Sequence, residues 1–391
     1  MQIVDFVFFD AGGGHRSSAT ALCEVIQRQG FPWRVRMVNL QELLDPIDII
    51  RRTTGVRIQD VYNQILKKGW TLGSSQLLKV LLAAVRLYHK EEVRLLRDHW
   101  TRSQPDLVVS VIPHFNRALR ESLIQAAPGT PFVTILTDIA DYPPHFWMEP
   151  QEQFFICGSD RAAEQARAMG ISEQLVCRSS GMIIHPRFYE PVLVDRSAER
   201  QSLGLNPGML TGLVMFGGQG SRIMIDIARR VDASRMQVQL IFICGRNQRL
   251  ADELRRRRGR NPSFVEGFTK EIPYYMHLAD FFIGKPGPGS ISEALAMKLP
   301  VVVQENSWTL PQERYNTQWI REKKVGIVVN SFRDVARAIA EVLQPENYSQ
   351  LRANAAALNN RAVLEIPAIL DKIMKTAAIR PVFRSAQIQS G

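Results

Sequence analysis

Ile3-Val-Asp-Phe-Val-Phe-Phe9 leads directly into Asp10-Ala-Gly-Gly-Gly-His-Arg-Ser-Ser18. The first run is rich in Val, Ile and Phe, which is typical of a buried strand, and the glycines that follow allow a sharp turn. After the turn, Leu22, Val25 and Ile26 recur at the spacing of one helix face. A strand that passes through a glycine turn into an amphipathic helix is the building unit of parallel sheets. This stretch therefore predicts a doubly wound α/β fold.

The same succession recurs along the chain in two series. The first series predicts further strands at residues 33–39, 106–112, 131–138, 153–157 and 175–180. The second begins at Gly212 and predicts strands at residues 213–216, 238–244, 263–265, 281–283 and 301–304. Two such series predict two Rossmann-like domains, with a cleft between them where the carboxyl ends of both sets of strands meet.

Prolines and charges between the two series indicate a domain boundary. We expect an N-terminal domain over residues 1–185, a linker over 186–207 and a C-terminal domain over 208–362. A terminal helix over 363–379 is a candidate to cross back to the N-terminal domain, and residues 380–391 form a tail.

Composition excludes several classes of protein. The 391 residues are 45% hydrophobic and 22% charged, which fits a folded chain and excludes a disordered, collagen-like or disulfide-stapled one. The four cysteines are far apart and outside any metal-ligand spacing, which indicates a reducing compartment. We find no secretory leader and no run of about 18 apolar residues, so we expect a cytoplasmic protein without a membrane span. The net charge of +11 fits nucleic acid, an anionic membrane or phosphate-bearing substrates.

The first glycine loop, Gly12 to Gly14, is neither a complete dinucleotide fingerprint nor a Walker motif, because Ser17 stands where the third glycine would be and no Gly-Lys-Ser/Thr follows. His15 lies in the first turn of the helix that follows. There the helix dipole disfavours the imidazolium, so the neutral imidazole can accept a proton at pH 7. A histidine that only caps the turn or faces solvent fits the same position.

Two more glycine loops, Phe216-Gly-Gly-Gln-Gly-Ser-Arg222 and Gly284-Lys-Pro-Gly-Pro-Gly-Ser290, follow strands of the second series. Together their backbone N–H groups could hold a diphosphate from two sides. The pattern Ser290-Ile-Ser-Glu293 fits a capping box, although Glu293 could instead accept the hydroxyls of a ribose. Further on, Gln312-Glu-Arg-Tyr-Asn316 places amide and carboxylate groups where they can bind a polyhydroxyl ligand or simply begin an exposed helix.

Taken in order, these motifs resemble a known family over about residues 5 to 330. The chain is similar to the monogalactosyldiacylglycerol synthase and processive diacylglycerol glucosyltransferase group, and more distantly to the transferase that adds N-acetylglucosamine to the peptidoglycan lipid precursor. The motifs that carry the resemblance are Gly12-Gly-Gly-His15, Phe216-Gly-Gly-Gln-Gly220, Gly267-Phe268, Gly287-Pro-Gly-Ser290, Glu293, Gln312-Glu313 and Asn316.

The resemblance implies a GT-B fold, an acceptor-binding N-terminal domain and a UDP-sugar-binding C-terminal domain that together catalyse inverting transfer without a metal or other cofactor. It implies that two loops hold the diphosphate, that Phe268 lies beside the uracil and that Glu293 takes the ribose hydroxyls. The donor-binding residues it implies are Gly217, Gly218, Gln219, Gly220, Ser221, Phe268, Gly287, Pro288, Gly289, Ser290 and Glu293, with Gln312, Glu313 and Asn316 at the sugar.

By the same resemblance, His15 is the candidate general base for a lipid hydroxyl, and Asp138 either orients His15 or is itself the base. The implied acceptor-binding residues are Gly12, Gly13, Gly14 and His145. His145 is displaced from the His-Pro that the galactolipid synthases carry after a Thr-Asp pair, because here the segment reads Thr137-Asp-Ile-Ala-Asp-Tyr-Pro-Pro-His145-Phe-Trp147. Phe146 and Trp147 could dip into a bilayer interface or be buried in the core.

The leading hypothesis is a peripheral membrane enzyme that moves galactose or glucose from a UDP-sugar to diacylglycerol. The basic, apolar stretch Ile58 to Arg97 would dock on an anionic membrane, or would form two core helices. The alternatives are an N-acetylglucosaminyltransferase for a polyprenyl-linked acceptor, a UDP-N-acetylglucosamine 2-epimerase, and a basic nucleic-acid-binding protein. The nucleic-acid-binding hypothesis does not explain the glycine loops, so we expect no nucleic-acid partner.

Overall fold

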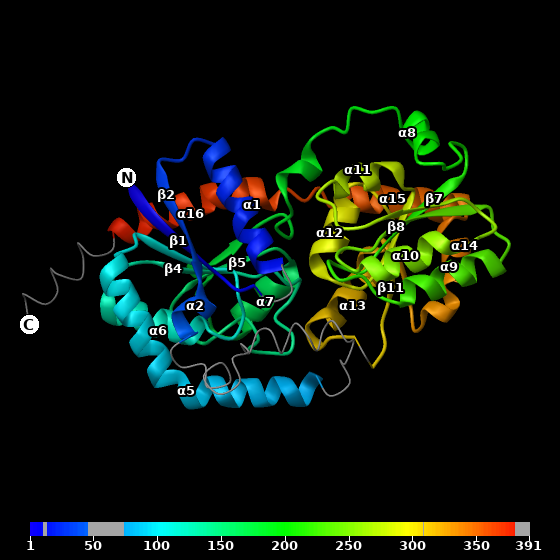
Figure 1. Ribbon diagram of the computed structural model, residues 1–391. Helices are drawn as coiled ribbons and strands as arrows, with labels where there is room; N and C mark the ends of the chain where they lie inside the picture. The colour runs from blue at the N-terminus through cyan, green and yellow to red at the C-terminus, as the bar shows by residue number, and fades with distance from the viewer. Residues whose placement is uncertain (11–13, 46–73, 308, 380–391) are drawn as a thin grey trace, which may run out of the picture. The chain divides into compact units, whose positions relative to one another are not determined.

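The computed structural model describes residues 1–10, 14–45, 74–307 and 309–379 (Figure 1). Contacts within the chain divide it into two compact units. The first comprises Met1–Pro186 together with the chain from Arg361 onward, and the second comprises Arg187–Asn360. The terminal helix α16 (Ala362–Ile379) belongs to the first unit, where it packs against α1 (Gly14–Arg28).

The first unit is built on one parallel sheet in the order β2-β1-β3-β4-β5-β6. Its inner strands β3, β4 and β5 are apolar on both faces, as expected where helices cover a sheet on both sides, whereas the edge strand β2 carries Arg34 and Arg36. The order reverses between β1 and β3, which makes their carboxyl ends the switch point of this sheet. The strands are β1 (Gln2–Phe8), β2 (Trp33–Asn39), β3 (Leu107–Ser110), β4 (Phe132–Ile135), β5 (Phe154–Cys157) and β6 (Val176–Arg178).

The long helix α5 (Ser74–Ser103) forms part of the core of the first unit. Val93, Leu96 and Trp100 are buried, and Trp100 Nε1 donates a 3.0 Å hydrogen bond to Ser122 Oγ on α6. The end of the stretch expected to dock on a membrane or to form core helices is therefore a core helix, while residues 58–73 lie outside the described residues. The other helices in the described part of this unit are α2 (Leu40–Leu44), α6 (Asn116–Ala126), α7 (Asp160–Ala168) and the short η2 (Glu173–Leu175). The short η3 (Pro186–Tyr189) begins at the last residue of the stretch Met1–Pro186 and lies mostly in the second unit.

The second unit is built on a parallel sheet in the order β12-β11-β10-β7-β8-β9. This is the Rossmann order, and its switch point lies between β7 and β10. The strands are β7 (Leu210–Met215), β8 (Val238–Ile243), β9 (Ser263–Glu266), β10 (Phe281–Gly284), β11 (Val301–Gln304) and β12 (Gly326–Val329). The sequence prediction missed β12, a four-residue edge strand. It begins at Gly326, where a Cβ would lie 2.0 Å from the Val301 carbonyl oxygen, so only glycine fits.

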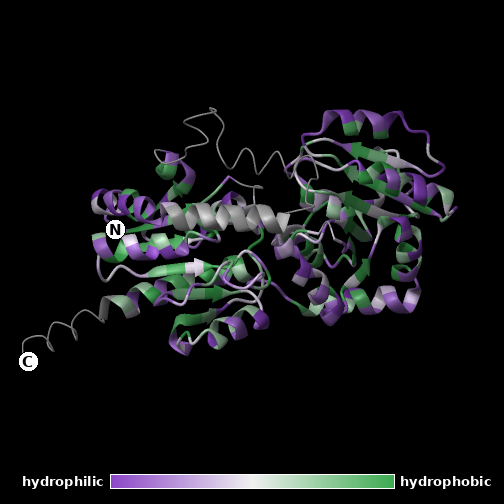
Figure 2. Cartoon of the chain, turned by 90° about the horizontal axis from the view of Figure 1, so that it is seen from below, coloured by the Kyte–Doolittle hydropathy of each residue, from purple (hydrophilic) through white to green (hydrophobic). Residues whose placement is uncertain are grey.

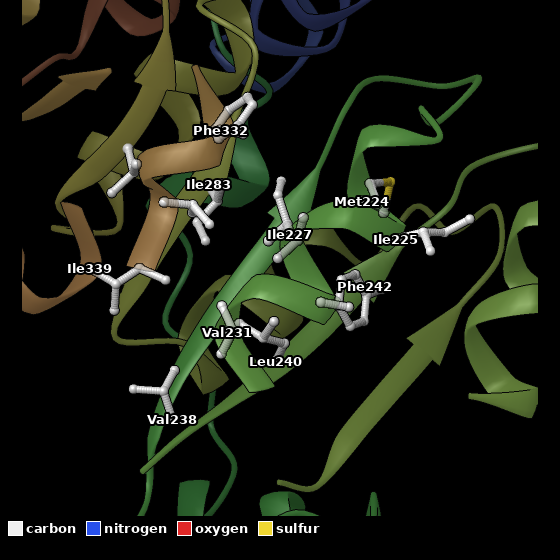
Figure 3. Close-up of a cluster of buried hydrophobic side chains, with 14 of the residues drawn as sticks. Met224, Ile225, Ile227, Val231, Val238, Leu240, Phe242, Ile283, Phe332 and Ile339 are labelled. Carbon is white, nitrogen blue, oxygen red and sulfur yellow. The ribbon is translucent and has the colours of Figure 1, made fainter. Parts of the chain in front are cut away.

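One apolar cluster joins the sheet of the second unit to helices beside it (Figure 3). Ile227 and Val231 of α9 pack on Leu240 and Phe242 of β8. In Figure 2 the strands are mostly green, whereas the helices combine green and purple residues, as amphipathic helices do. The helices are α8 (Arg196–Ser202), α9 (Ile223–Ala233), α10 (Gln248–Arg256), α11 (Ile272–Leu278), α12 (Pro288–Ala296), α13 (Arg314–Lys323), α14 (Val335–Val342) and α15 (Pro345–Ala357), with short turns η4 (Pro311–Glu313) and η5 (Phe332–Asp334).

The segment expected to be a linker, residues 186–207, contains α8, which is anchored to the second unit by a buried ion pair. Arg200 Nη2 lies 2.8 Å from Asp280 Oδ2, and Arg196 Nη2 lies 2.7 Å from Asp280 Oδ1. The same carboxylate accepts a 2.8 Å hydrogen bond from the backbone N–H of Thr211. Arg200 and Asp280 are both buried, so each charge depends on the other for compensation.

We expect Asp280→Ala to lower the free energy of unfolding of the second unit by about 3–5 kcal/mol, because it leaves a buried guanidinium without its carboxylate. Urea denaturation measures the loss. Asp226→Ala is the matched control, since Asp226 pairs with Arg229 on an exposed helix face and should cost less than about 1 kcal/mol. Equal costs for the two variants would show that the buried pair does not anchor α8.

Candidate functional site

The switch point of the first sheet holds His15, in the first turn of the helix that follows β1. His15 Nδ1 lies 2.7 Å from the carbonyl oxygen of Val111, just beyond β3, and 3.4 Å from Thr137 Oγ1. A carbonyl oxygen only accepts hydrogen bonds, so Nδ1 carries the proton and Nε2 is the basic atom of the ring. Burial lowers the pKa of His15 to about 4, so the imidazole is neutral at pH 7. This is the protonation state that a general base needs.

The glycines beside His15 are only partly described. Gly12 and Gly13 lie outside the described residues, and Gly14 is the first residue of α1. Among the described residues, no atom outside its chain neighbours and its own helix backbone lies within 4 Å of the position that a Cβ on Gly14 would occupy.

Asp138 follows β4 and is buried, where its Oδ2 accepts a 2.9 Å hydrogen bond from Trp147 Nε1. The Trp147 ring in turn lies 6.0 Å from the His15 ring, measured between centroids. Because a backbone carbonyl already engages His15 Nδ1, that carbonyl sets the tautomer. Asp138 thus holds the indole ring of Trp147 beside His15.

A tight loop after Asp138 positions His145 and the aromatic pair that follows it. Asp141 accepts backbone hydrogen bonds from His145 at 2.9 Å and from Trp147 at 2.6 Å. His145 is exposed and has a left-handed φ of +64°. Phe146 and Trp147 are buried, so the interpretation that they dip into a bilayer is wrong: the Asp141 turn directs both rings into the unit's core.

His114 also lies at this sheet edge, just after β3, and the sequence analysis missed it. It has a φ of +68°, and its Nδ1 is buried without a hydrogen-bond partner among the described residues. Its ring packs edge-on against Phe146 at 4.2 Å, and burial together with His15 lowers its pKa to about 4. Its position in the sequence could have predicted this. His114 follows β3, which pairs with β1, so it lies at the same sheet edge as His15.

In the second unit, the loop after β7 is shaped by glycines. Gly217 and Gly220 have φ of +73° and +60°, and a Cβ on Gly220 would lie 2.7 Å from the Cys244 carbonyl oxygen. A Cβ on Gly218 would meet no described atom within 4 Å, and the Gly218 carbonyl oxygen accepts a 2.9 Å hydrogen bond from the N–H of Arg246. Gln219 is exposed, and Ser221 Oγ accepts a 3.4 Å bond from the N–H of Ile223.

The loop after β10 faces the same switch point. Gly287 is the N-cap of α12, Pro288 is its first residue, and Gly289 is exposed with open space around it. Ser290 Oγ donates a 3.4 Å hydrogen bond to the Gly287 carbonyl. The first-turn N–H groups of a helix have no partner within the helix, so those of Gly289 and Ser290 are available to an anion.

Glu293 does not close a capping box. Because α12 begins at Pro288, Ser290 is inside the helix and no side chain caps its start. The Glu293 carboxyl is partly buried without a counter-charge in the described residues, and burial raises its pKa to about 8. The capping interpretation is therefore wrong, and a buried carboxyl without a structural partner is typical of a ligand-binding group.

Glu313 is buried beside the same loop. Its Oε1 lies 2.7 Å from Lys285 Nζ and 3.5 Å from the place of a Cβ on Gly287. Asn316 is fully buried, and its Nδ2 donates a 2.8 Å hydrogen bond to the Pro286 carbonyl, which anchors the loop. Gln312 is partly buried one residue before Glu313.

Phe268 follows β9 and is 54% exposed, which is unusual for so large an apolar ring. The guanidinium carbon of Arg246 lies 4.7 Å from the centre of the ring, as in a cation–π contact. Arg246 also binds Gly218 through its backbone, so the ring, the arginine and the first loop are connected. An exposed, supported ring is suited to stack on a planar base.

Residues 1–10, 14–45, 74–307 and 309–379 contain no group of three or more His, Cys, Asp or Glu side chains placed to hold a metal ion. In the same ranges no helix is both long and apolar enough to cross a bilayer.

Comparison with known proteins identifies the class. Residues 212–368 match the glycosyltransferase family 28 C-terminal domain. The chain is 27% identical over 383 residues to monogalactosyldiacylglycerol synthase 2 of Arabidopsis thaliana, covering 93% of this chain and 79% of the relative. It is 29% identical over 350 residues to a probable monogalactosyldiacylglycerol synthase 2 of Oryza sativa subsp. japonica, covering 85% and 71%.

Among solved structures, MurG of Acinetobacter baumannii has a TM-score of 0.59 at 11% identity and covers 95% of this chain and 100% of its own. Anabaena Alr3699/HepE, solved with UDP and glucose, has a TM-score of 0.55 at 17% identity, with 96% and 100% covered. These likenesses show the fold. The chain is a glycosyltransferase of the GT-B fold; its residues 212–368 match the glycosyltransferase family 28 C-terminal domain, and it resembles the monogalactosyldiacylglycerol synthases over most of its length.

Proposed function

We propose that this protein transfers a hexose, galactose or glucose, from a UDP-sugar to diacylglycerol at a membrane surface, with inversion at the anomeric carbon. The observation that carries the proposal is the neutral His15, whose Nδ1 proton is fixed on the Val111 carbonyl while Nε2 is left basic. Its similarity to monogalactosyldiacylglycerol synthases supports the acceptor, and the UDP and glucose bound in the structurally similar Alr3699/HepE support the donor.

In the proposed reaction, His15 Nε2 removes the proton of the lipid hydroxyl as its oxygen attacks the anomeric carbon. The bond between that carbon and the UDP oxygen breaks on the opposite face, and UDP leaves with the electron pair. Negative charge therefore grows on the diphosphate, where the N–H groups of Gly289 and Ser290 would stabilise it. His145 and the glycines around Gly14 would line the acceptor side.

On the donor side, Phe268 would stack on the uracil and Glu293 would accept the ribose hydroxyls. The loop residues Gly217 to Ser221 and Gly287 to Ser290 would surround the diphosphate, with Gln312 and Glu313 at the sugar. Asn316 would act by holding the Pro286 carbonyl, since its amide is buried. The net charge of +11 would hold the protein peripherally on anionic lipid at the cytoplasmic side, more weakly as salt increases.

The test is to incubate the purified protein with UDP-galactose, UDP-glucose or UDP-N-acetylglucosamine and anionic liposomes that contain diacylglycerol, and to identify products by mass spectrometry. We expect a hexosyl diacylglycerol. Absence of a glycolipid with every donor contradicts the proposal. If UDP-N-acetylglucosamine gives a product only when polyprenyl phosphates are present, the protein is instead an N-acetylglucosaminyltransferase. If UDP-N-acetylglucosamine is epimerised without lipid, the protein is instead a 2-epimerase.

We expect the transfer rate to be nearly unchanged by EDTA. The reason is that backbone N–H groups at two loops and the nearby Lys285 supply positive charge where the diphosphate would lie, so no divalent cation is needed there. The initial rate of glycolipid formation measured with EDTA and with added Mg²⁺ checks this. A rate that collapses with EDTA and returns with Mg²⁺ contradicts it.

A further inference from the structure

Lys285 lies at the switch point of the second sheet, within the loop Gly284 to Ser290, and the sequence predicted no role for its side chain. It is the first residue after β10, and β10 pairs with β7. Its Cε lies 3.3 Å from the place of a Cβ on Gly287 and 3.9 Å from that on Gly217. Each glycine loop therefore contributes a residue beside this one lysine side chain.

The ammonium group of Lys285 is bonded to Glu313, with 2.7 Å between Nζ and Oε1. The lysine side chain is 45% exposed, whereas that of Glu313 is 9% exposed. One partner can reach solvent and a ligand, while the other is held at the base of the site.

We propose that Lys285 is a donor-binding residue and that the diphosphate of a nucleotide donor competes with Glu313 for its ammonium group. When the diphosphate binds, Nζ moves from Glu313 to the phosphate oxygens, and the carboxylate of Glu313 becomes free to accept a hydroxyl of the sugar. The inference rests on the proposed function in so far as the donor is a sugar nucleotide.

The charges favour this exchange. A diphosphate carries more negative charge than one carboxylate and is a strong hydrogen-bond acceptor, so a half-exposed ammonium gains by moving to it. Glycine at Gly217 and Gly287 keeps the space beside the lysine clear. Once released, Glu313 is a buried carboxylate without its counter-charge, which favours a hydroxyl donor at that position. Donor binding and sugar recognition are thereby coupled through one ion pair.

The experiment is calorimetric titration of the intact protein with UDP and with UMP, without lipid. Wild type should bind UDP more tightly than UMP, which lacks the second phosphate. Lys285→Met should lower UDP affinity about 10- to 100-fold, the usual loss for a charge-assisted hydrogen bond, and UMP affinity much less. Glu313→Gln should raise UDP affinity, because no carboxylate then competes for the ammonium, and should lower the transfer rate from the UDP-sugar.

The double variant tests the coupling, since the gain from Glu313→Gln should vanish when Lys285 is methionine. Lys323→Met is the matched control: Lys323 is the exposed last residue of α13 and should leave both affinities unchanged. The inference is overturned if Lys285→Met binds UDP like wild type, or if Glu313→Gln weakens UDP binding as Lys285→Met does. Wild type that binds UDP as described but makes no glycolipid contradicts the proposed function alone.

Discussion

Replacing His15 by alanine should lower the rate of glycolipid formation about 10²- to 10⁴-fold, the usual contribution of a general base, and leave UDP affinity nearly unchanged. The reason is geometric: His15 lies in the first unit, at the switch point between β1 and β3, and its Nδ1 is bound to Val111. Its removal takes away Nε2 as the base without touching the glycine loops of the second unit. Initial rates and calorimetric titration with UDP measure the two effects.

The pH profile gives a second readout of His15. Burial holds its pKa at about 4, so the base is neutral from about pH 5 upward and the rate should not fall between pH 7 and pH 5 through this group. If the base were a solvent-exposed histidine with an ordinary pKa near 6.5, the transfer rate would fall as the pH is lowered below about 6.5. His185→Ala is the matched control, because His185 pairs with Glu24, further along α1, and should keep full activity. Loss of UDP affinity in His15→Ala would place His15 in the donor site instead.

Glu293→Gln should weaken UDP binding about 10- to 100-fold at pH 9, because the ribose hydroxyls lose a carboxylate acceptor. In the free protein burial raises the pKa of Glu293 to about 8, so the carboxyl is mostly protonated at pH 7 and mostly ionised at pH 9. UDP should bind more tightly to the protein in which the Glu293 carboxyl is ionised. Wild-type affinity for UDP should therefore rise about tenfold from pH 7 to pH 9, whereas that of Glu293→Gln should stay flat.

Two controls separate this effect from other titrations. The affinity of wild type for a UDP analogue without the 2′ and 3′ hydroxyls should not rise from pH 7 to pH 9, because no ribose hydroxyl then donates a hydrogen bond to the Glu293 carboxylate. In the ligand-free protein, the thermal stability of wild type should fall with increasing pH, whereas its UDP affinity rises. A carboxyl whose pKa is raised on folding loses stability as pH increases through its folded pKa, so wild type should melt below Glu293→Gln at pH 9 and close to it at pH 4. The same pH dependence in both proteins would contradict the assignment.

Much of the fold follows from local sequence. Short apolar runs, several of them followed by glycine turns, predicted the strands of both sheets except β12, and the inner strands are continuously apolar because they are buried on both faces. β12 escaped because it begins at Gly326, a residue type that strands usually avoid. That glycine is required by the close approach of Val301, which only the paired structure shows.

The site was predictable where backbone chemistry defines it. The glycine loops and His15 follow strands directly, and parallel strands bring their carboxyl ends to one edge of a sheet. Side chains that act through partners distant in sequence were missed or misread. His114 lies outside every recognised motif, and Lys285 lies within a glycine loop in which only the backbone was given a role. The capping interpretation of Glu293 failed because α12 begins two residues before Ser290.

The sequence by itself determined the α/β class, the two series of strands and the positions of the loops, since these depend on residue type and short-range periodicity. The tertiary structure alone decided the state of the groups that would react. The tautomer of His15 depends on a carbonyl 96 residues away, and the partner of Lys285 stands 28 residues away. Protonation and pairing depend on burial and on distances between neighbours, and strand order, which no local pattern encodes, creates those neighbours.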